Sequence, residues 1–259
     1  GYDSRELVGK TPFDFMPQRE ARRVAAVFNG FAAKREPFAF LENINRHKNG
    51  RPVVMETSGV PFFAPDGSLL GYRGVDRDIT ERKQVGRQLQ QSLRRLERTM
   101  EAIIQSISTT IETRDPYTAG HQRRVTQLAG VIARDMNLPS SQIAGIRVAG
   151  LLHDIGKICV PTEILNKPGQ LSDVEMALIR AHPKVGYGIL KSIEFEWPVA
   201  DIVVQHHERL DGSGYPSGIK GDEILLEARI LAVADVVEAM SSHRPYRPAK
   251  SVDSALEEI

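Results

Sequence analysis

The sequence lacks most of the features that would assign it to a specialised class of protein. Its 259 residues include a single cysteine, Cys159, so no disulfide can form within the chain, as is usual in a reducing cytoplasm. No apolar run reaches the roughly 18 residues of a membrane span, and no signal peptide opens the chain. The net charge of +1 predicts no nucleic-acid polymer as a partner. We expect a cytoplasmic protein, membrane-attached only if a segment missing before residue 1 provides an anchor, since both ends look cut.

The composition that remains is that of a folded globular chain. Hydrophobic residues make up 41% and charged residues 26%, which excludes disorder as the main state. The length suits one large domain or two modest ones.

Ionisable residues interrupt apolar helical patterns at several places in the second half of the chain. His153 and Asp154 stand side by side at the end of one such pattern and are followed by Gly156 and Lys157. Asp235 lies inside the apolar run 230–237, where an unpaired carboxylate would be costly. The full set of such residues is His121, His153, Asp154, His182, His206, His207 and Asp235.

Each of these residues has a plainer explanation when it is taken alone. An inward histidine such as His121 or His182 is more often a hydrogen-bonded core residue than a ligand, His153-Asp154 could be a buried pair, and Asp235 could bind an arginine. Five histidines and two aspartates within about 115 residues are nevertheless hard to bury without an ion. Seven donors exceed the needs of one tetrahedral zinc, and their mixture suits octahedral Fe or Mn in a two-metal site.

Two motifs carry a family resemblance that runs from about residue 100 to the end. The stretch 153–157 reads His-Asp-Ile-Gly-Lys, and 206–216 runs from His206-His207 to Gly214-Tyr215-Pro216. This pair resembles the signature of the HD-GYP family, which are cyclic di-GMP phosphodiesterases within the HD metal-dependent phosphohydrolases. The resemblance implies an all-α helical bundle that binds two divalent metal ions through the seven residues named above.

The same resemblance implies roles around the metals. Asp154 would bridge the two ions, which would activate a water for in-line attack on phosphorus. Lys157 would neutralise phosphate charge, and Arg244 and Arg247 offer forked donors for phosphate or guanine. Gly214, Tyr215 and Pro216 would form a loop that approaches the substrate, although it could also be a simple connector. Some family members carry a glutamate that helps hold a third metal, and this chain has Tyr117 at that position. We therefore expect two metals. We also expect a first cut to linear pGpG more readily than complete hydrolysis to GMP.

The N-terminal residues 1–80 predict a separate α+β domain. Helical patterns at 4–8 and 20–33 precede alternating patterns at 38–45, 53–63 and 69–75, and Asp66-Gly67 is a hairpin signal. The segment resembles a PAS sensor domain without its two opening strands, with Glu6 to Lys10 matching an early helix and Asp78 to Arg82 matching the usual exit. No ligand can be named, because the segment has no cysteine and His47 lies in a polar loop.

A long helix is predicted between the two domains, with its linker part at 81–112. Apolar residues recur at spacings of three and four without a proline, which suits the seam of a parallel homodimeric coiled coil or a helix packed on its own domain. These residues are Val85, Leu89, Leu93, Leu96, Met100, Ile103, Ile107 and Ile111. Residues 113–259 then read as the helical domain, with helices near 118–136, 140–153, 172–191, 198–207 and 222–240, and we expect this domain to continue beyond residue 259.

Three functions fit these patterns. The first is a PAS-regulated cyclic di-GMP phosphodiesterase in bacterial signal transduction. The second is a non-catalytic module that binds the cyclic dinucleotide or docks a diguanylate cyclase through the Gly214-Tyr215-Pro216 loop. The third is an HD phosphohydrolase acting on another nucleotide or cyclic dinucleotide.

Overall fold

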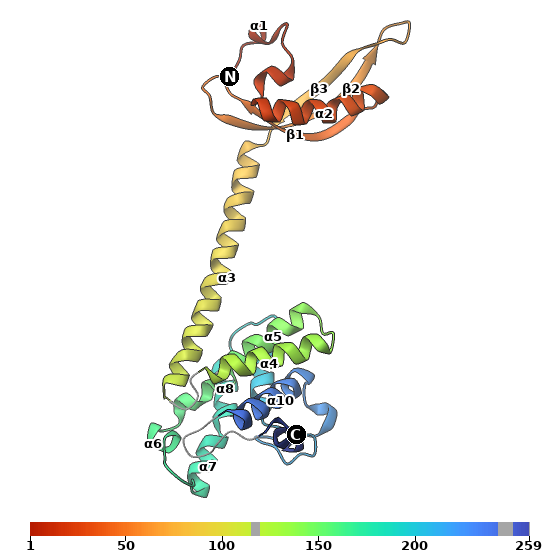
Figure 1. Ribbon diagram of the computed structural model, residues 1–259. Coiled ribbons are helices and arrows are strands. Elements are labelled where there is room, and N and C mark those ends of the chain that lie inside the picture. The colour runs from red at the N-terminus through yellow and green to blue at the C-terminus, as the bar shows by residue number, and fades with distance from the viewer. Residues whose placement is uncertain (115–119, 243–250, 259) are drawn as a thin grey trace. The chain divides into compact units, whose positions relative to one another are not determined.

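The computed structural model describes residues 1–114, 120–242 and 251–258 (Figure 1). These residues form two compact units, 1–96 and 97–259. The unit boundary falls inside one helix, so the domain limits predicted at residues 80 and 112 stay predictions. None of the helices among the described residues has the length and apolar character needed to cross a membrane.

The first unit is a small antiparallel sheet with one main helix packed on it. It contains α1 (Ser4–Leu7), η1 (Pro12–Phe15), α2 (Gln18–Lys34) and the strands β1 (Phe38–Arg46), β2 (Pro52–Phe63) and β3 (Leu69–Asp78), in the order β1-β2-β3. Gly50 and Gly67 adopt the positive φ angles of 88° and 81° that the two hairpin turns require. The predicted helices and hairpins of this unit are confirmed.

Aromatic packing joins α2 to the sheet. The Phe28 ring lies edge-on to Phe38 and to Tyr72, with centroids 5.7 and 5.0 Å away. The Tyr72 hydroxyl donates to the carbonyls of Phe31 and Glu36, so β3 is also tied to the end of α2. A cavity of about 660 Å³ is lined in part by these rings and by Met55.

Helix α3 (Thr80–Arg114) is uninterrupted, as predicted (Figure 1). Thr80 begins it by donating its backbone N–H to Asp78, while its hydroxyl accepts from the Val54 N–H. The residues of the apolar stripe from Val85 to Ile107 are exposed, with Leu96 57% accessible.

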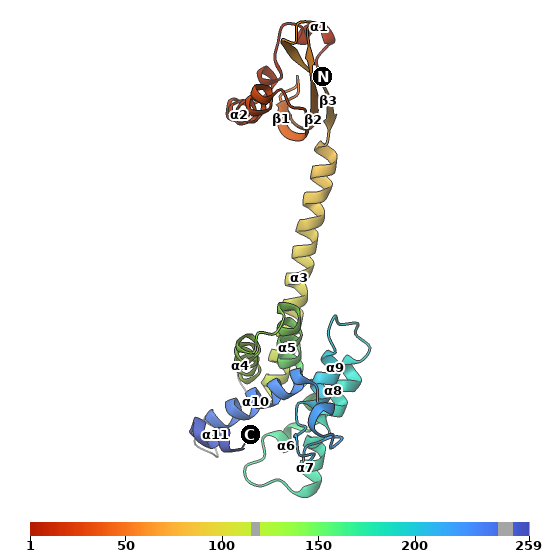
Figure 2. The same cartoon turned by 90° about the vertical axis from the view of Figure 1, so that its right-hand side faces the viewer.

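The second unit is all helical, as predicted (Figures 1 and 2). Its elements after α3 are α4 (His121–Asp135), α5 (Ser140–Leu152), η3 (Ile155–Cys159), α6 (Thr162–Leu165), α7 (Asp173–Arg180), α8 (His182–Leu190), α9 (Val199–Gln205), η4 (Gly221–Glu223), α10 (Leu226–Ser241) and α11 (Val252–Glu258). Val125, Ile146 and Leu231, from α4, α5 and α10, are fully buried in one core.

The prediction of a single helix over 172–191 was wrong. Helix α7 ends at Arg180 and α8 begins at His182. Pro183 has no N–H to donate to the carbonyl of Ile179, four residues earlier, so the helical ladder is interrupted there. The imidazole of His182 donates a hydrogen bond to that carbonyl instead, with an Nδ1 to oxygen distance of 2.7 Å. The break therefore also orients a candidate ligand.

Candidate metal centre

All seven donors predicted from the sequence come together in the second unit. His121 lies on α4, His153 and Asp154 follow the end of α5, His182 starts α8, His206 and His207 follow α9, and Asp235 lies on α10. Their ligand atoms form three groups of three within 4.8 Å. Two of these groups share no member, namely His121, His153 and Asp235, and His182, His206 and His207, while the third, His153, Asp154 and His206, takes one histidine from each of them. We call the two groups that share no member the first triad and the second triad. His153, His182 and His206 are each 1% exposed.

Helix ends set the orientation of three of these histidines. The last carbonyls of a helix have no partner within it, so a side chain can bind them. His153 Nδ1 donates to Gly150 O at 2.7 Å, and His206 Nδ1 donates to Val203 O at 2.6 Å. His182 does the same at Ile179, as described above. In each ring the Nε2 atom is therefore left to face the interior of the cluster.

This arrangement favours a cation between two of the rings. The Nε2 atoms of His182 and His206 lie 3.3 Å apart. Because each Nδ1 carries the proton, both Nε2 atoms of the neutral rings present lone pairs, which repel at this distance. Burial lowers the pKa of His182, and burial together with the neighbouring histidines holds the pKa of His206 well below its ordinary range. A proton is thus disfavoured, and a metal ion fits the position.

Asp154 lies between the two triads. Its Oδ1 atom is 3.4 Å from His182 Nε2 in the second triad, and its Oδ2 atom is 3.5 Å from His153 Nε2 in the first. Burial would raise the pKa of this carboxyl, but Lys157 and the surrounding histidines outweigh it and hold the pKa well below its usual range. An ionised carboxylate with one oxygen toward each triad suits the predicted bridge between two cations.

Lys157 reaches Asp154 rather than open solvent. Its Nζ atom lies 2.8 Å from Asp154 Oδ2, and its side chain is 20% exposed. The residue sits on the short helix η3, so it is three positions from Asp154 on a tight turn and not on a continuation of α5. Its proposed contact with phosphate stays a prediction.

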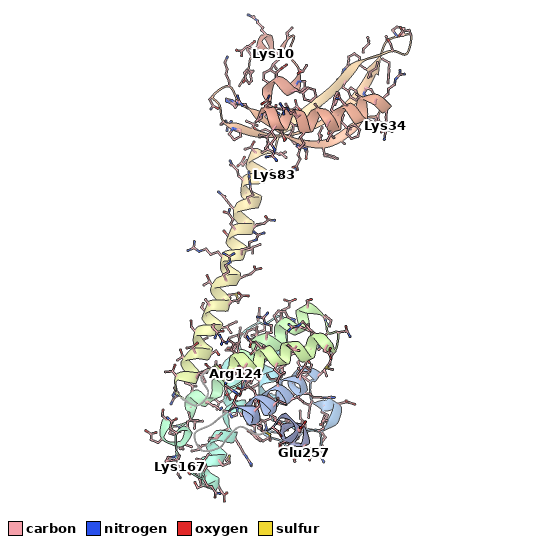
Figure 3. All side chains as sticks on the ribbon, in the orientation of Figure 1. Lys10, Lys34, Lys83, Arg124, Lys167 and Glu257 are labelled. Carbon is pink, nitrogen blue, oxygen red and sulfur yellow. The ribbon has the colours of Figure 1, made fainter. Side chains whose placement is uncertain are left out.

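The sequence reasoning missed Glu238, which supports His121. Its carboxylate accepts from His121 Nδ1, while Asp235 Oδ1 lies 3.1 Å from His121 Nε2. Arg124, labelled in Figure 3, donates to the other Glu238 oxygen at 2.6 Å. Burial lowers the pKa of His121, but the bonds to the two carboxylates outweigh it and raise that pKa to about 9. Glu238 follows Asp235 by one helical turn, a spacing that could have indicated it.

Replacing Glu238 by glutamine should weaken metal binding about tenfold or more, because the carboxylate that orients and polarises His121 is lost. Titration of metal-free protein with Mn²⁺, followed calorimetrically, measures this. Glu194→Gln makes the same change at an exposed residue outside the centre and should bind Mn²⁺ like the wild type. If Glu238→Gln and the wild type bound Mn²⁺ with equal affinity, Glu238 would have no supporting role in metal binding.

Glu208 is a second residue that the sequence reasoning missed. Its buried carboxylate accepts the backbone N–H groups of Ser217 at 2.7 Å and Gly218 at 3.1 Å, so it anchors the loop after His207. A Cβ atom on Gly214 would lie 2.4 Å from Arg209 N, so the close packing within the loop requires glycine at this position. Pro216 follows in a cis peptide.

Tyr215 of this loop packs against a candidate ligand. Its ring lies 4.7 Å from the His207 ring, centroid to centroid, at an angle of 32°. Burial first, and then the charges of Asp235 and Asp154, raise the pKa of its hydroxyl. Gly214 and Tyr215 line a pocket of about 510 Å³ together with His206 and His207. Substrate contacts by the loop stay predictions, and the other predicted substrate residues, Arg244 and Arg247, lie outside the described residues, as does Tyr117.

The fold and the donor set together define a helical metal-binding domain that follows a PAS-type sheet domain. Residues 105–259 match the HD domain family, and residues 1–84 match the PAS fold. The chain belongs to the HD domain family, and its two motifs are those of the HD-GYP group.

Three curated relatives illustrate this membership. The chain is 38% identical to the cyclic di-GMP phosphodiesterase response regulator RpfG of Xanthomonas campestris, over 73% of this chain and 51% of that protein. It is 41% identical to the 3'3'-cGAMP-specific phosphodiesterase 3 of Vibrio cholerae, over 61% and 34% of the two chains. Identity to the cyclic di-GMP phosphodiesterase PA4108 of Pseudomonas aeruginosa is 43%, over 56% and 36%. The chain thus spans between a third and a half of the length of these relatives.

Proposed function

We propose that this chain is a metal-dependent phosphodiesterase that hydrolyses cyclic di-GMP to linear pGpG, with GMP as a further product. The observation that carries the proposal is the placement of Asp154, with one oxygen toward each triad. The relatives named as cyclic di-GMP phosphodiesterases support the choice of substrate. The imidazole and carboxylate donors suit two Fe or Mn ions.

The chain's own residues have defined tasks in this proposal. The two triads and Asp154 would hold the cations, which, when bound, provide an activated water and neutralise phosphate charge. Lys157 keeps Asp154 ionised and stands at the partly exposed edge of the centre, where it would contact a phosphate oxygen. Tyr215 and Gly214 line the pocket that opens onto the second triad, so they would border the bound nucleotide.

Turnover by anaerobically purified, Mn- or Fe-loaded protein tests the proposal directly. Cyclic di-GMP is incubated with the protein and the products are separated by chromatography, with His153→Ala/Asp154→Ala as the control. We expect pGpG, with or without GMP, that disappears in the control. Absence of turnover with two bound metals would reject the enzyme and leave the dinucleotide-binding or diguanylate-cyclase-docking module as the alternative.

A second candidate substrate is 3'3'-cGAMP. The relative from Vibrio cholerae that is named for this substrate is 41% identical, which is close to the identity of the relatives named for cyclic di-GMP. The two substrates differ in one base only. Comparison of kcat/KM for both with the same metal-loaded preparation decides between them, and the higher value identifies the preferred substrate.

We also propose that the chain forms a homodimer through α3. From Leu89 to Ile107 the exposed apolar residues alternate at spacings of four and three, which is the a and d pattern of a coiled coil. The same stripe on a second copy is complementary by symmetry. Such a dimer would pass a change in the PAS domain along α3 to the HD domain.

Light scattering during size-exclusion chromatography measures the predicted dimer. Leu96→Glu should shift the chain to monomer, because it places a charge in the seam, where it would be desolvated. Gln91→Glu adds the same charge on the opposite side of α3 and should leave the dimer intact. A monomeric wild-type protein would contradict the proposal.

A further inference from the structure

Three arginines line the pocket that opens onto the second triad, and they differ in their partners. Arg209 is paired with Glu258 at 3.2 Å, and Arg229 is paired with Asp222 at 3.1 Å. Within residues 1–114, 120–242 and 251–258, Arg180 has no carboxylate at ion-pair distance. Its positive charge is therefore the one of the three that is left for an anion entering the pocket.

The position of Arg180 is set by Tyr215. The guanidinium carbon lies 5.5 Å from the centre of the Tyr215 ring, as in a cation–π contact. The same ring packs on His207, and the backbone N–H of Tyr215 donates to the His207 carbonyl at 3.1 Å. Arg180 is the last residue of α7, whose start is closed by the Ser172 and Glu175 capping box. The guanidinium thus lines the pocket and contacts the same aromatic ring that packs on a candidate metal ligand.

The partner of Arg180 is Tyr215, whereas the donor atoms that would hold the cations belong to the two triads and Asp154. The phosphodiester that is cut would have to reach the cations that the two triads and Asp154 would hold. A cyclic dinucleotide carries a second phosphodiester on the opposite side of its ring, and that group must lie away from the metals when the first is bound. Arg180 contacts the Tyr215 ring, which also packs on His207, and it lines the same pocket as His206 and His207, so the guanidinium is suited to this second group.

We propose that Arg180 binds the phosphodiester of the cyclic dinucleotide that is not being cut. The inference rests on the proposed function and adds a substrate-binding residue to it. A forked guanidinium binds a phosphodiester through two charge-assisted hydrogen bonds, and the Tyr215 ring beneath it limits its freedom before the substrate arrives. Arg180 would therefore favour substrates with two phosphodiesters over substrates with one.

Kinetics with two substrates test this assignment on the metal-loaded full chain. Arg180→Gln should raise the KM for cyclic di-GMP about tenfold and leave kcat within about a factor of two, since the lost contact is present in both ground and transition states. Hydrolysis of bis(p-nitrophenyl) phosphate, which has a single phosphodiester, should be unchanged. Arg180→Lys keeps the charge and loses the fork, so its KM for cyclic di-GMP should lie between those of the wild type and Arg180→Gln. Arg147→Gln removes an exposed arginine of α5 and should match the wild type on both substrates.

The other outcomes overturn the assignment. An equal loss on both substrates would place Arg180 at the reacting phosphate or show that it acts through Tyr215 and His207. No loss on either would reduce it to a packing partner of Tyr215. Binding of cyclic di-GMP to metal-free protein, measured by calorimetry, separates this inference from the proposed function. Weaker binding by Arg180→Gln supports the contact even without turnover, whereas a wild type that neither binds nor cleaves rejects both.

Discussion

Replacing Asp154 by alanine is expected to reduce hydrolysis of cyclic di-GMP by about a thousandfold or more, because several kcal/mol of electrostatic stabilisation depend on the two cations. The carboxylate is 3% exposed and lies within 3.5 Å of a histidine of each triad. Without it no carboxylate would link the cations that the two triads would hold, and these cations would repel each other with one negative charge fewer between them. Metal content, measured by mass spectrometry of the purified protein, should fall together with the rate.

The control for this change is an aspartate of the same domain outside the centre. Asp201 lies on α9 and is exposed, so Asp201→Ala removes a carboxylate without touching either triad. It should retain wild-type metal content and rate. If Asp154→Ala kept two metals and its activity, the bridging role would be wrong, and the two triads would have to hold their ions independently.

Replacing Gly156 by alanine should destabilise the HD domain by about 3 kcal/mol and empty the second triad. A Cβ atom at this position would lie 1.9 Å from the carbonyl oxygen of His182 and 2.7 Å from the backbone nitrogen of Gly186. Both obstacles are backbone atoms of α8, so a side-chain rotation cannot remove the overlap and the helix must shift. His182 is the first residue of α8, and its Nε2 atom would move with it.

The measurement for Gly156→Ala is the melting temperature of the full chain together with its metal content. A loss of about 3 kcal/mol corresponds to a decrease of roughly 6–12 °C for a domain of this size. Gly188 lies on the same helix, and a Cβ atom added there would have no atom within 4 Å. Gly188→Ala should therefore stabilise the helix slightly, by about 0.5–1 kcal/mol, and retain both metals. A Gly156→Ala protein with the wild-type melting temperature and metal content would contradict this prediction and show that α8 can shift without loss of stability.

The close approach of Gly156 to α8 belongs to a larger connection within the second unit. Arg114, at the end of α3, donates through its guanidinium to the carbonyls of Ile158 and Val160 on either side of the end of η3. The η3 segment follows Asp154 directly and carries Lys157 and Gly156. A displacement of the last turn of α3 would thus reach both Asp154 and His182 through the Arg114 guanidinium and the backbone of η3. We propose that regulation through α3 acts along this connection.

Much of the architecture could be predicted because it depends on local pattern. The alternating residues of β1 and β2, the turns at Gly50 and Gly67 and the uninterrupted apolar stripe of α3 each reflect a single period or a single backbone requirement. The break between α7 and α8 also has a local cause in Pro183, but the apolar pattern continues across it and concealed it. A residue pattern reports which face of a segment is buried, and it does not report whether the segment is one helix or two.

The candidate donors of the centre could be predicted from the sequence alone, because imidazoles and carboxylates inside apolar patterns need a partner when they are buried. Only the tertiary structure decided how they group. Which histidines form each triad, the position of Asp154 between them, and the support from Glu238 depend on how α4, α5, α8, α9 and α10 face one another. His121 and Glu238 are 117 residues apart in the chain, and their contact is fixed by the packing of α4 against α10. Local chemistry thus determines that a residue needs a partner, whereas the packing of distant helices determines which partner it meets.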